Sequence, residues 1–377
     1  MAYEKKNPPE TACLATEVSE GFDEIEKFPS RLLRLSKARK ASDETIRYGE
    51  SFLKGERQTD EFLLTDLGPV VRRMDGCAQW LRFRQYFTIN KIRLGGIHTC
   101  QIPLLCQFCA ILRAARQLKA YFARYNVVVA ENSHLKPYLL TLTVANGDDL
   151  KERLSHLQSC FKEYCKRRRQ WKSVGRGFNE FCKIEGAAFS YEVTRNNENK
   201  SWHPHLHAVI LVDPNNPIDF PVNGSPSAKK NSKLSQEWLA ITGDSSIVDC
   251  RPISENPMDG FLEVFKYTVK FSEMHDFDKY MAYFTLKGKR LQGSFGLFWG
   301  VKVPENETDD IAPDLPYVEL IYRHTKNGYE IFHVGERAIQ GGIELPGNTR
   351  SFVPMPTDGY VTEDGEYKPF TKCDRKT

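Results

Sequence analysis

Two strand-like segments separated by a short polar turn constrain the fold of this chain more than any other feature. The first is IEGAAFSYEVTR, residues 184–195, the second is PHLHAVILV, residues 204–212, and the turn between them contains NNENK. If the turn is centred between Glu198 and Asn199, Glu192 lies opposite His205 and Ser190 lies opposite His207. Directly opposed residues project from the same face of a sheet. The pattern therefore predicts a hairpin that brings one carboxylate beside two imidazoles.

Glu192, His205 and His207 would offer three ligands for a divalent cation and leave other positions open. Such a mixed oxygen and nitrogen site suits Mg²⁺ or Mn²⁺ at phosphoryl chemistry, and Zn²⁺ or Fe²⁺ would also fit. A register shift of one residue would turn Glu192 to the other face. His203 would then compete for the place of third ligand, although Pro204 marks a strand's first residue and puts His203 at the rim.

A cluster of cysteines precedes a long helical pattern. Cys100, Cys106 and Cys109 lie in HTCQIPLLCQFC, and the spacing of the last two is typical of a structural zinc site. The fourth ligand would be Cys77, with His98 as the alternative. Burial of the cysteines as ordinary core residues is the competing interpretation. Because carboxylates and further histidines are missing from the motif, we expect this zinc to be structural.

The remaining patterns predict an α+β fold with a central antiparallel sheet of about five strands flanked by helices. Strands are expected at 86–94, 137–145 and 246–253 and helices at 71–85, 109–125, 150–172, 232–242 and 258–271, with a hairpin over 317–334 around Lys326-Asn327-Gly328. We divide the chain into an N-terminal helical extension at 1–70, a zinc-binding and helical region at 71–130, a central domain at 131–303 and a C-terminal extension at 304–377.

Composition places the chain in a broad class. A content of 40% hydrophobic residues over 377 residues is typical of a folded protein, and no apolar run approaches the ~18 residues of a membrane span. The N-terminus has no apolar core of a signal peptide. We therefore expect a cytoplasmic protein whose cysteines are thiols or metal ligands, not disulfides.

Positive charge gathers in two segments although the net charge is only +4. Runs of Lys and Arg can follow a nucleic-acid backbone, but more often they form the solvated face of a helix. The candidate contacts with DNA are Lys166, Arg167, Arg168, Arg169, Lys172, Lys289 and Arg290.

A third motif, FLEVFKYTVKFSE, places Glu263, Tyr267 and Lys270 on one stripe of the helix expected at 258–271. Alone, such a tyrosine is usually a packing residue. Together with the cysteine cluster, the strand YLLTLTV and the HPHLHAVIL strand, the motif resembles the rolling-circle plasmid replication initiators of the HUH (His-hydrophobic-His) endonuclease superfamily. Within it, the resemblance is to the single-tyrosine branch that carries a cysteine motif.

The resemblance extends over about residues 71–300, and its four parts stand in the expected order. One departure is Gln107-Phe108, where a proline commonly follows the second cysteine. The resemblance implies the HUH endonuclease fold and a nickase. Tyr267 would attack a phosphodiester, leaving a 5′-phosphotyrosine and a free 3′-OH, with the metal at His205, His207 and Glu192 polarising the phosphate. Lys270 would stabilise negative charge nearby.

In this branch, the carboxylate that matches Glu263 activates the water that ends a round of replication, a general-base role. Pairing of Glu263 with Lys266 or Lys270 along the helix is the alternative. The resemblance also implies single-stranded or extruded origin DNA as the substrate. No G-x-x-x-x-G-K-[ST] motif is present. A host helicase and polymerase are therefore expected partners, and the oligomeric state stays open.

Three rival functions remain open. A transposase of the same superfamily would share every catalytic residue. A non-enzymatic zinc-containing DNA-binding protein would keep the histidines as structural residues. A small-molecule metalloenzyme, such as an oxygenase, would use the same two histidines and glutamate for different chemistry.

Overall fold

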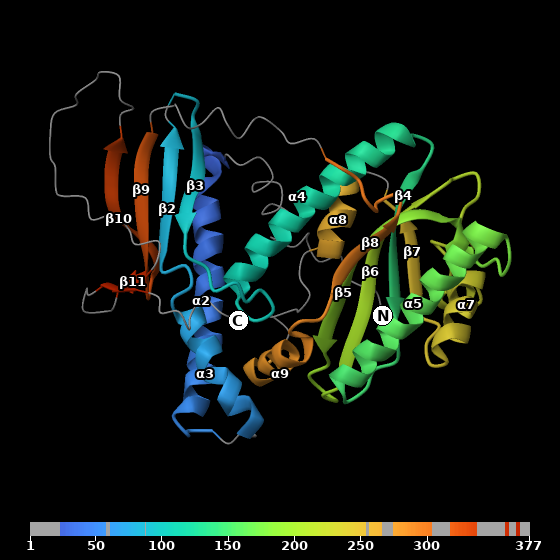
Figure 1. Cartoon of the computed structure of the whole chain (residues 1–377), viewed down its shortest axis with the longest axis horizontal. Coiled ribbons are helices and arrows are strands. Elements are labelled where there is room, and N and C mark those ends of the chain that lie inside the picture. Colours follow the sequence, from blue (N-terminus) through green and yellow to red (C-terminus); the bar gives the residue numbers. More distant parts are fainter. Residues whose placement is uncertain are drawn as a thin grey trace. The chain divides into compact units, whose positions relative to one another are not determined.

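The computed structural model describes residues 23–57, 61–86, 88–253, 256–265, 274–303, 317–337, 359–361 and 367–369. The chain divides into two compact units (Figure 1). Unit 1 comprises Ala110–Glu305, and unit 2 comprises Glu20–Cys109 with Asn306–Thr377.

Unit 1 is built on a five-stranded sheet in which all neighbouring strands are antiparallel. The strand order is β7-β4-β6-β5-β8. The strands are β4 (Lys136–Thr143), β5 (Ile184–Arg195), β6 (Trp202–Val212), β7 (Val248–Pro252) and β8 (Gln292–Gly296). The predicted α+β architecture with a central antiparallel sheet is therefore confirmed.

Helices cover both faces of this sheet. They are α4 (Gln107–Glu131), α5 (Leu150–Val174), η2 (Glu180–Lys183), α6 (Pro226–Lys230), α7 (Lys233–Thr242), α8 (Pro257–Phe265) and α9 (Asp276–Leu286), with the first residues of α4 belonging to unit 2. Asp149 caps the N-terminus of α5, and Gly175 ends it in the left-handed conformation with φ 69°. On one face, Phe161 of α5 packs against Phe189 and Tyr191 of β5.

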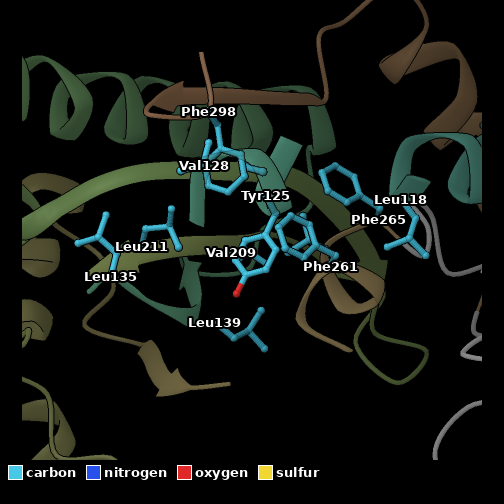
Figure 2. Packing of buried hydrophobic residues seen from close by; sticks show 12 residues of the cluster. Leu118, Tyr125, Val128, Leu135, Leu139, Val209, Leu211, Phe261, Phe265 and Phe298 are labelled. Carbon is cyan, nitrogen blue, oxygen red and sulfur yellow. The ribbon is translucent and has the colours of Figure 1, made fainter. Parts of the chain in front are cut away.

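The opposite face carries the core that positions the site. Val209 and Leu211 of β6 belong to a buried apolar cluster that also contains Phe261 of α8 and Tyr125 of α4 (Figure 2). Because alternate residues of a strand share a face, His205 and His207 lie on the same face as Val209 and Leu211. The histidines therefore occupy one end of a strand whose other end is anchored in the apolar core.

Unit 2 contains a second five-stranded antiparallel sheet in the order β1-β3-β2-β9-β10. Its strands are β1 (Asp23–Glu24), β2 (Trp80–Tyr86), β3 (Lys91–Ile97), β9 (Tyr317–Thr325) and β10 (Gly328–Arg337), and β11 (Gly359–Val361) pairs with β12 (Tyr367–Pro369). Its helical segments are η1 (Ile25–Lys27), α2 (Phe28–Leu53) and α3 (Glu61–Asp75). Phe28 of α2 packs on Phe83 and Tyr322, so that α2 covers one face of the sheet.

The helix expected at 71–85 is wrong over most of its length. The helix α3 ends at Asp75, and β2 follows with Leu81 and Phe83 buried on one face and Arg82 and Arg84 on the other. This alternation has the period of a strand, and tertiary pairing with β3 and β9 decides the conformation.

The hairpin predicted over 317–334 is confirmed, with Lys326 and Asn327 as its two-residue loop. Its strand β9 pairs with β2. Unit 2 therefore combines residues from both ends of the chain, and the pairing of strands so far apart in sequence leaves no local signal. Among the described residues, no helix is both long and apolar enough to cross a membrane.

Candidate functional site

The predicted hairpin register is confirmed. In the pairing of β5 with β6, Glu192 lies opposite His205 and Ser190 lies opposite His207. Glu192 Oε2 is 3.4 Å from His205 Nε2 and 3.1 Å from His207 Nε2. All three side chains are buried, and their ligand atoms lie within 4.8 Å of one another. The hairpin therefore forms the three-ligand cluster expected of a divalent metal site.

Neighbouring polar groups orient both imidazoles toward Glu192. Nδ1 of His207 is 2.9 Å from Thr141 Oγ1 on β4, and Nδ1 of His205 is 3.3 Å from the carbonyl oxygen of His203. Metal-ligating histidines usually bond through their other ring nitrogen in this way, which fixes the ring and leaves Nε2 for the metal. The donor set therefore fits a divalent cation, and Thr141 is a supporting residue that the sequence analysis did not identify.

The charge of Glu192 is stabilised in place. Burial alone would raise the pKa of its carboxyl group, but hydrogen bonds and charge from His205 and His207 outweigh burial and hold the pKa well below its usual range. A lowered pKa favours the carboxylate form, which is the state a metal ligand needs.

His203 lies outside this cluster. Its Nδ1 is 2.6 Å from Asn146 Oδ1, beyond the end of β4. The geometry thus groups Glu192, not His203, with the other two histidines.

The helix α8 is held on the face that carries the cluster. Ser190 on β5 donates a hydrogen bond from Oγ to the carbonyl oxygen of Val264. Val264 and Phe265 are buried, and Phe265 stacks on Tyr121 of α4 with ring centroids 4.4 Å apart. Glu263, the residue before Val264, lies on α8. The other two members of the predicted stripe, Tyr267 and Lys270, lie outside the described residues.

Loss of the Ser190 hydroxyl is expected to loosen α8 against β5. In Ser190→Ala, a buried carbonyl loses its donor, which typically costs about 1–3 kcal/mol. We expect a lower melting temperature, whereas Ser190→Thr, which keeps the hydroxyl, should retain most of the parent's stability. Thermal unfolding of the two variants checks this, and an Ala variant with the parent's melting temperature would contradict it.

The four predicted cysteines form one buried cluster in unit 2. Cys109 Sγ is 3.6 Å from Cys77 Sγ and 3.4 Å from Cys100 Sγ, and Cys106 Sγ is 3.7 Å from Cys77 Sγ. A tetrahedral zinc with Zn–S bonds of about 2.3 Å separates its sulfur atoms by about 3.8 Å. The spacing is thus consistent with a zinc site.

Cys77, and not His98, completes this cluster. His98 is exposed, and its Nδ1 is 3.0 Å from the carbonyl oxygen of Gly76. The turn that carries Cys77 is held by Arg39 of α2, which is 1% exposed and donates to the carbonyls of Met74 and Asp75. The cluster therefore ties α2, the end of α3 and the start of α4 together.

Ser42 of α2 is a further support that the sequence did not suggest. Its hydroxyl is 3.6 Å from Cys106 Sγ, and it accepts a hydrogen bond from the backbone N–H of Gln107. The hydrogen bond from Cys100, with further ones from Cys109 and Cys77, holds the pKa of Cys106 well below its usual range. A serine on α2 thus contacts a candidate thiolate.

Of the candidate DNA contacts on α5, four side chains are exposed and one, Arg168, is buried. Lys166 and Arg167 pair with Glu163, and Lys172 pairs with Glu185. Arg169 is exposed. Exposed ion pairs of this kind are weak and leave the cations accessible.

Arg168 is different. It is 8% exposed, donates to the carbonyls of Ile184 and Glu185, and lies over the ring of Phe295. Because its guanidinium is buried and hydrogen-bonded within unit 1, Arg168 is not available to contact DNA. In the second basic segment, Arg290 is exposed and donates to the carbonyl of Gln292, and Lys289 is half-buried.

Arg168 and Arg169 form a matched pair for testing these roles. Arg168→Ala should lower the free energy of unfolding by about 2 kcal/mol or more, because two carbonyls lose their donor. Arg169→Ala should leave the free energy of unfolding unchanged. If this surface contacts DNA, the variant should also reduce the slope of the logarithm of the DNA-binding constant against the logarithm of the salt concentration by about 1. Chemical denaturation and DNA binding at several salt concentrations measure both effects. Equal destabilisation by the two variants would contradict this division.

Comparison with known proteins adds independent information. The family model of the Rep_1 replication proteins matches residues 91–327. The chain belongs to the Rep_1 replication protein family. The matched range includes the histidine strand, Glu192, α8 and three of the four clustered cysteines.

Curated relatives of this Rep_1 protein carry the name "Protein rep". One from Bacillus sp is 29% identical over 188 residues, covering 48% of this chain and 52% of the relative. One from Bacillus amyloliquefaciens is 28% identical, covering 49% of each chain, and one from Streptococcus pneumoniae is 25% identical, covering 61% of this chain and 70% of the relative. The chain thus spans about half the length of the two Bacillus relatives. No solved structure matches it significantly.

Proposed function

We propose that this Rep_1 protein initiates rolling-circle replication of a plasmid by nicking single-stranded origin DNA. The observation that carries the proposal is the buried cluster of Glu192, His205 and His207 on the sheet face that also holds α8. Membership of a replication protein family supports the biological setting. DNA at the origin is then the substrate.

The three residues of the cluster would hold a divalent cation. When bound, a divalent cation, which we propose to be Mn²⁺ or Mg²⁺, supplies Lewis-acid polarisation of the scissile phosphate. Glu192 provides the negative charge, and His205 and His207 provide neutral nitrogen ligands aimed by their Nδ1 partners. The strand β6 supplies a rigid base because its far end lies in the core.

Tyr267 is the proposed nucleophile. Its phenolic oxygen would form a bond to phosphorus while the bond from phosphorus to the 3′-oxygen breaks, leaving a 5′-phosphotyrosine and a free 3′-OH. The phenol loses its proton and the 3′-oxygen gains one, so charge is balanced. The proposal is supported by chain connectivity, because Tyr267 follows Val264, which Ser190 anchors beside the cluster, by three residues. Lys270, three residues further on, would stabilise charge on the phosphate.

Glu263 would act at the end of a round. It lies on α8, four residues before Tyr267 in sequence. As a general base it would take a proton from a water molecule that attacks the scissile phosphate. The bond from phosphorus to the 3′-oxygen would break, which leaves a 5′-phosphate and a free 3′-OH and ends the round. The free 3′-OH from the first cut would prime synthesis by a host polymerase, and a host helicase would unwind the plasmid.

The Cys77, Cys100, Cys106 and Cys109 cluster would hold a structural Zn²⁺ in the same protein. Four thiolates fill a tetrahedral coordination sphere and leave no position for substrate. We therefore assign this site to stability, and all chemistry to the cluster in unit 1.

The alternative functions are less well supported. A transposase would share the same residues, but the matching family consists of replication proteins. A non-catalytic DNA-binding protein would have to keep a buried carboxylate between two imidazoles for structure alone, and burial of such groups is costly.

Cutting of single-stranded DNA in the presence and absence of metal tests the proposal. Labelled oligonucleotides tiled across the DNA that flanks the gene are incubated with the protein and resolved on a denaturing protein gel. We expect one oligonucleotide to give a covalent adduct that mild chelation removes and Mn²⁺ or Mg²⁺ restores. Absence of any adduct with metal present would contradict the proposal, and a requirement for Fe²⁺ would favour an oxygenase.

A further inference from the structure

The sheet of unit 2 has a second face, opposite the one that α2 covers, that the proposed chemistry does not use. Along β2, Leu81 and Phe83 point toward α2, so the alternate residues Trp80, Arg82 and Arg84 point away from it. Trp80 lies opposite Arg323 of β9, and Arg82 lies opposite Ile321. This second face therefore combines aromatic and basic side chains.

Two aromatic rings meet across β9 on this face. The ring centroids of Trp80 and Phe332 are 4.8 Å apart in an edge-to-face arrangement, and the guanidinium of Arg323 lies 5.5 Å from the centroid of Trp80. Phe332 is the extra residue of a bulge between Ile331 and His333 in β10, and it is 63% exposed. An aromatic ring so exposed, beside an arginine, is a surface on which a flat ring can stack.

Positive charge continues along the same face. Arg84 of β2 lies directly opposite Arg93 of β3, and Arg82 precedes them by one step of the alternation. Glu319 of β9 lies opposite Arg84 on the other side and forms an ion pair with Arg82, at 3.7 Å. Arg84 also lies over the ring of Tyr317. This row therefore contains three arginines and one carboxylate, so positive charge predominates along it.

We propose that this aromatic–arginine face, defined by Trp80, Arg82, Arg84, Arg93, Arg323 and Phe332, binds single-stranded DNA. Bases stack on the exposed aromatic rings, and phosphates follow the arginine row. Proteins that bind single strands without sequence preference combine these two features. A second copy of the chain is a poorer occupant, because a symmetric contact between identical faces would bring the arginine rows together.

Neighbouring residues of β10 provide matched controls. Ile331 and Val334 are 56% and 55% exposed, comparable to Phe332. They lie opposite Tyr322 and Leu320, which belong to the face of the sheet that α2 covers. Substitution at Ile331 therefore removes a similar amount of exposed apolar surface without touching the aromatic–arginine face.

Binding of oligothymidine to the full chain tests the inference. Fluorescence anisotropy is measured with a labelled strand of about 15 nucleotides, which is within the range of known single-strand sites. Phe332→Ala should weaken binding at least about fivefold, because each stacked base contributes about 1–3 kcal/mol. Arg323→Ala should weaken binding and reduce its salt dependence. Ile331→Ala should stay within about twofold of the parent, and all variants should keep the parent's melting temperature.

Four outcomes would overturn the inference. These are unchanged binding in Phe332→Ala, an equal loss in Ile331→Ala, duplex DNA competing as well as the single strand, and an oligomer that Phe332→Ala dissociates without affecting DNA binding. This test of DNA binding can be distinguished from the test of nuclease activity. His207→Ala should still bind oligothymidine, and Phe332→Ala should still cut origin DNA at saturating concentration. If no variant cuts but Phe332 still controls binding, the nuclease proposal fails and this inference stands.

Discussion

His207→Ala is expected to bind single-stranded origin DNA and to cut it about 10²- to 10⁴-fold more slowly than the parent chain. His207 Nε2 is the ligand atom nearer to Glu192 Oε2, at 3.1 Å. Its loss removes one of the three protein ligands of the proposed metal, and with it several kcal/mol of charge stabilisation at the phosphate. Each increase of about 1.36 kcal/mol in the activation free energy slows the reaction tenfold. Single-turnover cutting of a labelled strand at saturating protein measures the effect.

His203→Ala is the matched control for this variant. His203 belongs to the same strand but pairs with Asn146 and lies outside the cluster. Its loss should change the cutting rate far less than the loss of His207. The melting temperature of both variants is recorded to separate misfolding from lost chemistry. Equal effects at the two positions would mean that the cluster is not the catalytic metal site.

Cys106→Ala is expected to release the proposed structural zinc and to destabilise unit 2. Cys106 is 0% exposed, and its sulfur atom lies 3.7 Å from Cys77 Sγ and 3.6 Å from Ser42 Oγ. In small domains, the binding of a structural zinc provides about 10–16 kcal/mol of apparent folding free energy. We expect about one zinc per chain in the parent, much less in the variant, and a loss of stability of at least about 3 kcal/mol.

Cys250→Ala provides the control for removing a buried thiol. Cys250 on β7 is 3% exposed and lies outside both candidate metal sites, where burial raises the pKa of its thiol to about 12. Its replacement should leave the zinc content unchanged. Elemental analysis and thermal unfolding measure the two variants side by side. A parent chain without zinc, or a Cys106→Ala chain that is as stable as the parent, would contradict the assignment.

The geometry of the histidine hairpin was predictable because its determinants are local. A short turn sets which residues of β5 and β6 face each other, and the period of two then places Glu192 with His205 and His207. The same reasoning could not identify Thr141, since β4 precedes the hairpin by more than forty residues and nothing in its sequence specifies the pairing.

Long-range pairing also explains what the sequence did not reveal in unit 2. The strand β2 is flanked by β3 and by β9, which follows it only after the whole of unit 1. Without its partner strands, the segment 71–85, with its basic and apolar residues, is predicted to be one helix. The sequence predicts Cys77 as the fourth ligand and His98 as the alternative, since both lie at a plausible distance along the chain, and the fold groups Cys77 with the other three cysteines.

Arg168 shows a signal that was present in the sequence. Leu157, Phe161, Tyr164 and Arg168 follow one another at intervals of four, three and four residues, and all are buried. This is the spacing of the apolar stripe of a helix. Arg168 therefore extends the buried face of α5, whereas the run of positive charge, taken without the helical period, predicts a contact with DNA.

Mass spectrometry of the protein–DNA adduct tests the central claim most directly. The purified adduct formed with Mn²⁺ is digested with protease and nuclease, and the modified peptide is sequenced. The account predicts a phosphonucleotide on Tyr267, and no adduct in Tyr267→Phe although that variant still binds the strand. A phosphonucleotide on another residue, or an adduct that persists in Tyr267→Phe, would contradict it.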